Sequence, residues 1–279
     1  ECIPMLKRSD IKREAAKIIN EELTVDDSLF LYHDVCTNGI GYVDLMFKTD
    51  SIAPEQIPYL GLLKSVLGYV DTENYTYGEL FNEINANTGG INCGVEVFDR
   101  ADSTEEFQAM FSVRGKALYT KMDFLFKMIG EILNSSKLED TKRLYEIVAS
   151  VKSRAQVNLT GAGHSTAVLR AAAYSSPMAA FQDEMAGIGY YQFIEKLEKD
   201  FEQRKEETVE ELCKLMKEIL RPENFMISYT GERESLETVQ KLAGTVKAGL
   251  GTEPVEKSEE KLTCTKKNEG FKTSGQVQY

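Results

Sequence analysis

The sequence predicts an α+β fold in which an antiparallel sheet carries helices packed mainly on one face. Short segments with alternating apolar and polar residues occur early in the chain and again near its end. Between them, apolar residues recur every three or four positions, which indicates helices that each bury one face. The order of these strands and helices fits an antiparallel sheet with its helices on one side.

Residues 33–91 predict the first unit of this fold, in which a strand and two helices lead to another strand. Ile40–Lys48 alternates regularly, so its even-numbered residues share one face and its odd-numbered residues share the other. Pro54 suits the first turn of the next helix, which repeats apolar residues at helical spacing. A shorter helix at Tyr77–Asn87 then precedes the strand that begins at Ile91.

The rest of the chain continues the α+β pattern. Residues 95–98 and 107–113 indicate neighbouring strands joined by a polar turn. A late strand is expected at 225–230, followed by a closing helix at 235–250. The helices between them are expected at 120–134, 139–158, 165–174, from Pro177, at 191–199 and at 208–220.

Composition narrows the class of protein. The 279 residues carry 45 acidic and 33 basic side chains, a net charge of −12, which argues against nucleic acid as a partner. The longest apolar windows fall far short of the roughly 20 residues of a membrane span, so no membrane partner is expected. Five cysteines, an odd number without a C-x-x-C pair, favour a reducing compartment, either the cytoplasm or an organelle matrix.

Several short motifs occur in one order along the chain. They are TNGI at 37–40, IPY at 57–59 before an apolar helix, TGGI at 88–91, GH at 163–164 and YY at 190–191. Together they resemble the insulinase-type, or pitrilysin-like, zinc metallopeptidases of the presequence-protease and falcilysin branch. In that family two similar halves close around a peptide-holding chamber, and each half contains two homologous α+β domains. The resemblance implies that this chain is the third domain, in the non-catalytic half.

The resemblance also implies what should occupy the metal positions. Only the family's first domain carries H-x-x-E-H, in which two histidines bind zinc and the glutamate activates water. With a one-residue gap, Tyr59 and Leu63 align with the histidines and Leu62 aligns with the glutamate. None of the three can bind zinc as the family does. We therefore expect no catalytic, cofactor-binding or metal-binding residue in this chain, and zinc only in the catalytic domain of the parent protein.

The same resemblance implies the organisation of the chain. Residues 1–25 resemble the segment that follows an interdomain linker, and residues 26–250 are expected to form a single α+β domain. Residues 252–267 are rich in Glu, Lys and Thr, as in an exposed linker. Residues 271–279 alternate like the beginning of a strand. We therefore expect 251–279 to be a linker and the start of the next domain.

A glycine-containing stretch at 158–165, NLTGAGHS, suggests two other functions only weakly. A phosphate-binding loop would need glycine where Asn158 stands and lysine where His164 stands, and it would follow a strand. His164 could serve as a general base or as a locally hydrogen-bonded packing residue. No Ser-His-Asp signature accompanies it, so the structural role is favoured.

The implied function is that of a non-catalytic domain in a zinc-dependent peptidase that degrades short unfolded peptides. Such a domain would wall the substrate chamber and dock to the catalytic half, while this fragment itself would be inactive. Its partners would be the remaining domains of the parent peptidase and short peptides inside the chamber. The alternative is a structural or assembly subunit of the same fold with no peptidase activity.

Overall fold

The computed structural model describes residues 5–11, 13–14, 17, 19–103, 105–255, 257–258, 260 and 262–272. Six strands in these ranges form one sheet in the order β1-β2-β6-β3-β5-β4. The strands are β1 Glu21–Val25, β2 Ser28–Asp34, β3 Ile40–Lys48, β4 Ile91–Asp99, β5 Phe107–Leu118 and β6 Phe225–Gly231. The helices are α1 Ile57–Val66, α2 Tyr77–Asn87, α3 Met122–Ser135, α4 Thr141–Gly161, α5 Gly163–Ala172, α6 Pro177–Ala186, α7 Ile188–Lys199, α8 Phe201–Ile219 and α9 Leu236–Ala248.

The α+β class is confirmed, but the sheet is mixed rather than wholly antiparallel. β2 runs parallel to β6, with Phe30 opposite Ile227, whereas the other neighbouring strands are antiparallel. The two parallel strands come from opposite ends of the chain. No tight turn joins them, so nothing in the local sequence determines their relative direction.

β1 and β2 are strands that the sequence analysis did not identify. They form an antiparallel hairpin around Asp26 and Asp27, whose φ angles of 46° and 65° both lie in the left-handed region. Two-residue hairpin turns of this kind favour Asn-Gly or Asp-Gly, because glycine adopts positive φ without strain. The Asp-Asp pair is a weak turn signal, which explains why the hairpin was missed.

Most predicted helices are present, and their largest error is at α8. The helix begins at Phe201, seven residues before the predicted start, because its first turns are mostly charged and show no apolar stripe. α2 has the predicted bounds. Its N-cap Thr76 and Glu79 form a capping box, in which each side chain accepts a hydrogen bond from the other residue's backbone N–H.

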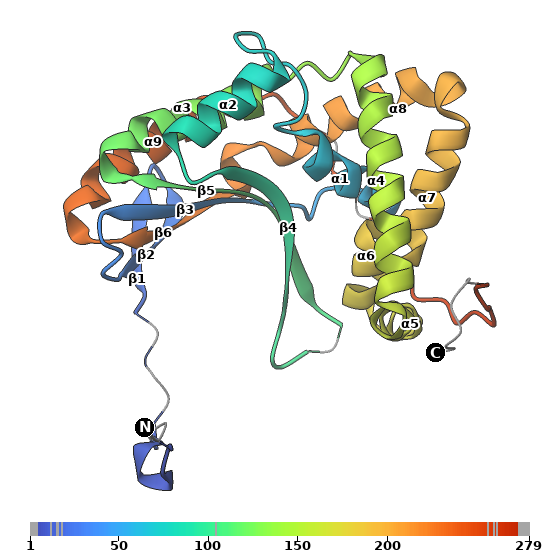
Figure 1. Cartoon of the computed structure of the whole chain (residues 1–279), viewed down its shortest axis with the longest axis horizontal. Coiled ribbons are helices and arrows are strands. Elements are labelled where there is room, and N and C mark those ends of the chain that lie inside the picture. The colour runs from blue at the N-terminus through green and yellow to red at the C-terminus, as the bar shows by residue number, and fades with distance from the viewer. Residues whose placement is uncertain are drawn as a thin grey trace.

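The helices form two groups around the sheet (Figure 1). α2, α3 and α9 lie over one face, and α1 with α4–α8 forms a bundle beside the curved β4–β5 hairpin. Tyr32, Leu45, Phe47 and Leu60 are fully buried in the core between sheet and helices. In the ranges that the structure describes, no helix is long and apolar enough to cross a membrane.

Gly61 lets α1 pack closely against α6 and α7. A Cβ at this position would lie 2.6 Å from the backbone oxygen of Met185 and 2.7 Å from the ring of Tyr190. We expect Gly61→Ala to lower the free energy of unfolding by about 1–3 kcal/mol, because the helices must separate. Gly130 in α3 is the matched control, since a Cβ there meets nothing within 4 Å.

Gly130→Ala should instead raise the free energy of unfolding by about 0.5–1 kcal/mol, because alanine is the better helix former. Urea unfolding followed by circular dichroism measures both variants. Stabilisation by Gly61→Ala would contradict the close packing of α1.

Candidate functional site

α1 contains the three residues that align with the zinc-binding motif. Tyr59, Leu62 and Leu63 are 6%, 0% and 1% exposed and belong to the main core. The Tyr59 ring packs edge-on against Phe193 at 4.8 Å between centroids, and its hydroxyl accepts a hydrogen bond from Arg204 at 2.9 Å. Burial raises the pKa of Tyr59 to about 12. Two leucines and a tyrosine that remains protonated at neutral pH do not fit a zinc ion.

The histidines lie far apart in the fold. His33 on β2 joins Ile19 to the sheet: its Nδ1 is 2.7 Å from the Ile19 carbonyl oxygen, and its Nε2 is 3.2 Å from the Ser228 hydroxyl. His164 lies at the exposed start of α5, 3.0 Å from the Ser165 hydroxyl. Among the described residues, no group of three or more His, Cys, Asp or Glu side chains is arranged to hold a metal ion.

The TNGI motif has a structural role that sequence analysis did not identify. The backbone N–H groups of Thr37 and Asn38 each donate to the Glu232 carboxylate at 3.1 Å, and Gly39 N–H donates at 3.3 Å. Asn38 and Gly39 have φ angles of 55° and 80°, so the three N–H groups converge on one anion. The Tyr119 hydroxyl also donates to this carboxylate.

These donors favour the charged form of Glu232. The Tyr119 hydroxyl makes the largest contribution and, together with the backbone N–H groups, lowers the pKa of Glu232 to about 2. The carboxylate therefore ties the start of β3 to the end of β6.

We expect Glu232→Gln to reduce stability at pH 7 and to do so less as the pH falls. A group whose folded pKa is about 2 and whose unfolded pKa is near 4.5 stabilises the fold fully above pH 4.5 and loses this effect toward pH 2. Urea unfolding of both proteins between pH 7 and pH 3 checks this. Glu234→Gln, an exposed carboxylate two residues away, is the control. A difference between wild type and Glu232→Gln that stays constant with pH would contradict the assignment.

A hollow of about 520 Å³ lies on the sheet face opposite the helices, lined by residues of β3, β4, β5 and β6. Asp44 and Arg114 form an ion pair at its floor, 2.8 Å apart, and Arg114 also pairs with Glu96 at 3.1 Å. Lys116 is exposed at the rim, with its Nζ 5.9 Å from the centre of the Tyr42 ring. Around this ion pair lie the polar side chains of Asn92, Ser228 and Thr230.

Asp44 retains bonding capacity inside this hollow. Its Oδ2 accepts from Arg114, while its buried Oδ1 has no hydrogen-bond partner among the described residues. Burial raises the pKa of Asp44, although Arg114 acts in the opposite direction. The hollow thus offers an unpaired acceptor, an exposed cation and several hydroxyl and amide groups, which suits a polar ligand held by hydrogen bonds.

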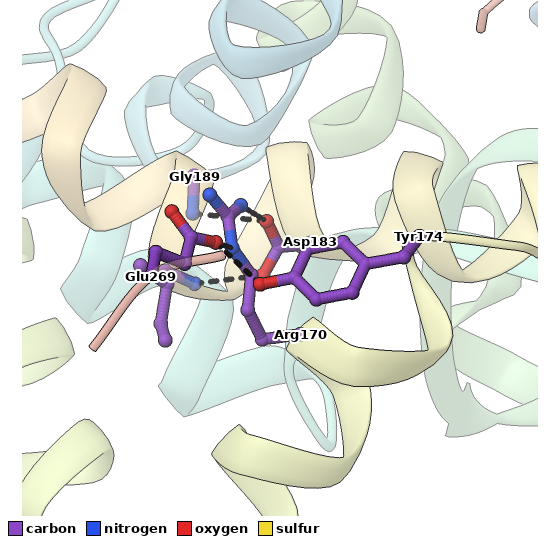
Figure 2. Close-up of polar contacts among 6 residues, drawn as sticks. Arg170, Tyr174, Asp183, Gly189 and Glu269 are labelled. Carbon is purple, nitrogen blue, oxygen red and sulfur yellow. Dashed lines mark hydrogen bonds and ion pairs between the residues drawn. The ribbon is translucent and has the colours of Figure 1, made fainter. Parts of the chain in front are cut away.

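A second polar cluster joins α5, α6 and α7 to the C-terminal part of the chain (Figure 2). Arg170 forms ion pairs with Asp183 and, at 2.6 Å, with Glu269. Asp183 also accepts hydrogen bonds from the backbone N–H groups of Ile188 and Gly189, at 3.0 and 3.1 Å, where α7 begins. Tyr174 donates its hydroxyl to Glu269 at 2.6 Å. Sequence analysis missed this cluster, because its members are far apart in the chain and match no motif.

Comparison with known proteins identifies the family. Residues 1–197, more than half of the chain, match the model of the associated domain of peptidase family M16, subgroup C. The chain belongs to this family of peptidase-associated domains. The resemblance to the non-catalytic domain of insulinase-type peptidases is thereby confirmed.

Two relatives show how much of a longer protein this peptidase-associated domain represents. It is 36% identical over 279 residues to Protein HypA of Clostridium perfringens, covering all of this chain and 28% of that protein. It is 26% identical over 240 residues to Presequence protease 1, chloroplastic/mitochondrial, of Arabidopsis thaliana, covering 86% of this chain and 22% of that protein. The chain therefore spans about a quarter of the length of these relatives.

Solved structures share the fold of this peptidase-associated domain. A peptidase M16 inactive domain from Pseudomonas fluorescens has a TM-score of 0.56 at 14% identity, over 87% of this chain and 54% of that one. A protease from Helicobacter pylori has a TM-score of 0.60 at 15% identity, over 88% of this chain and 54% of that one. At such identities the similarity establishes the architecture alone.

Proposed function

We propose that this chain is a non-catalytic domain of a zinc-dependent peptidase that degrades short unfolded peptides. In the proposal it walls the substrate chamber and docks to the catalytic half, which supplies the zinc and the water-activating glutamate. The observation that carries the proposal is the sheet face opposite the helices, with its polar hollow of about 520 Å³.

The chemistry of this face supports contact with peptides. An unfolded peptide presents backbone N–H and C=O groups along its whole length. The hollow offers acceptors in Asp44 and Ser228 and donors in Asn92 and Lys116. These groups can bind a backbone without selecting a particular side chain.

The buried side chains of α1 support a non-catalytic role for this domain. Tyr59, Leu62 and Leu63 fill the core where the catalytic domain of the family places its zinc ligands. The relatives named presequence proteases support a parent peptidase, with its remaining domains as partners. Four described cysteines are free thiols, which supports a reducing compartment such as the cytoplasm or an organelle matrix. Cys2 lies outside the described residues.

The experiment uses the full-length parent protein and its separately expressed parts. We expect peptide cleavage by the parent, none by the isolated chain, and recovery when this chain is mixed with the remainder. Metal analysis should find no stoichiometric zinc in the isolated chain. Full activity of the remainder alone would support the alternative of a structural or assembly role and overturn the chamber wall.

A charge reversal in the hollow tests the wall more directly. Lys116→Glu in the parent should change KM for peptide substrates, because Lys116 lines the hollow. Lys241→Glu, on the exposed surface of α9, is the control and should leave KM unchanged. Equal KM values for both variants and the parent would contradict peptide contact at the hollow.

A further inference from the structure

The last described segment of the chain, residues 262–272, lies against α5 and α6 without forming a helix or strand. We call this segment the strap. Leu262 and Cys264 pack against a small apolar cluster made by Ala173, Ala179 and Ala180. Near the end of the strap, Glu269 contacts Arg170 and Tyr174, as Figure 2 shows.

Arg170 is the centre of this attachment. Its side chain is 8% exposed, and its guanidinium bonds to Asp183 on one side and to Glu269 on the other. The guanidinium carbon also lies 5.8 Å from the centre of the Phe271 ring, within the range of a cation–π contact. The strap therefore presents a carboxylate and, two residues later, an aromatic ring to one arginine.

The bond between Arg170 and Asp183 belongs to the rigid body of the domain. Asp183 is 2% exposed and is held by two backbone N–H groups at the start of α7. Gly187 and Gly189 leave room for its carboxylate, since a Cβ at either position would overlap with Asp183. This partner is fixed whether or not the strap is present.

The bond between Arg170 and Glu269 is of a different kind. Glu269 is 23% exposed and comes from a segment without regular structure. Outside the regular elements, no backbone–backbone hydrogen bond described in the structure involves residues 262–272. The strap is therefore attached by side chains, and its charged contacts converge on Glu269.

We propose that the strap is a releasable element that docks on α5 and α6, with Glu269 as the latch and Arg170 as its fixed receptor. Removing the latch frees the strap and leaves the helices in place, because Asp183 keeps Arg170 in position. Docking also sets the direction in which the chain leaves the domain after Lys272. Coupling of that direction to the rest of a peptidase is the one part that rests on the proposed function.

Cys264 reports directly on the docked state, because its side chain packs against the alanine cluster. The experiment alkylates the 279-residue chain with iodoacetamide and measures modification of Cys264 by peptide mass spectrometry. We expect Glu269→Gln to raise the Cys264 modification rate about tenfold, through loss of two hydrogen bonds to a charged carboxylate. The midpoint of thermal unfolding should not change.

Glu260→Gln is the matched control, with the same change of charge at an exposed position of the tail. It should leave the rate of Cys264 modification as in wild type. Equal rates in wild type and Glu269→Gln would overturn the latch. A lower unfolding midpoint in Glu269→Gln would overturn release, since the strap would then be an inseparable part of the helix layer. Neither readout uses peptide cleavage, so this test and the test of the chamber wall can fail independently.

Discussion

Leu62→Glu, which introduces the glutamate of the family's zinc motif into α1, should lower the free energy of unfolding by more than about 4 kcal/mol. Leu62 is 0% exposed and lies in the main core, where a carboxylate would have neither water nor a cation. The side chain must then either ionise without a partner or remain protonated with unpaired oxygens, and both states are costly. Urea unfolding at pH 7 measures the loss.

The control at the same position is Leu62→Met. It keeps the side chain apolar and close in volume, so a loss below about 1.5 kcal/mol is expected. If Leu62→Glu were as stable as wild type, α1 would have to tolerate a polar face in this domain. The interpretation of α1 as a packing helix would then be wrong.

Arg170→Met should lower the free energy of unfolding by about 3–5 kcal/mol, because it leaves Asp183 as a buried charge without its cation. Methionine is long enough to keep part of the packing of Arg170, so the loss reports mainly on charge. Asp183 is 2% exposed, and its two backbone N–H donors offset only part of the lost ion pair. Chemical unfolding at pH 7 checks this value.

Arg233→Met is the matched control for this prediction. Arg233 pairs with Glu21 at 2.6 Å, but its side chain is 61% exposed. Water screens such a pair, so the change should be below about 1 kcal/mol. Similar losses for Arg170→Met and Arg233→Met would show that burial does not determine the strength of these ion pairs.

Features encoded by neighbouring residues were predictable. The bounds of α2 follow from its apolar spacing and from the glycines after it, and Pro177 begins α6 as expected. β3 also alternates as predicted, with Val43 and Leu45 buried toward the helices. Where the local signal was weak, prediction failed, as at the Asp26-Asp27 hairpin. The expected strand at 271–279 falls mostly on residues 273–279, which lie outside the described residues.

The polar sites could not be predicted in the same way. Thr37 and Glu232 are 195 residues apart, and Arg170 and Glu269 are 99 apart. An arginine on a helix and a glutamate in a linker each look like ordinary surface residues in the sequence. Only the packing of α5, α6 and the strap brings them together and removes water from their bond.

The sequence by itself determined the α+β class, the family resemblance and the identity of the residues at the family's metal positions. Each of these is a property of residue types at short spacing, which a linear chain carries without folding. Tertiary structure alone decided the parallel pairing of β2 with β6, the binding of Glu232 by the TNGI turn and the docking of the strap on Arg170. These depend on contacts between distant segments, whose geometry and burial exist only once the sheet and the helix bundle have assembled.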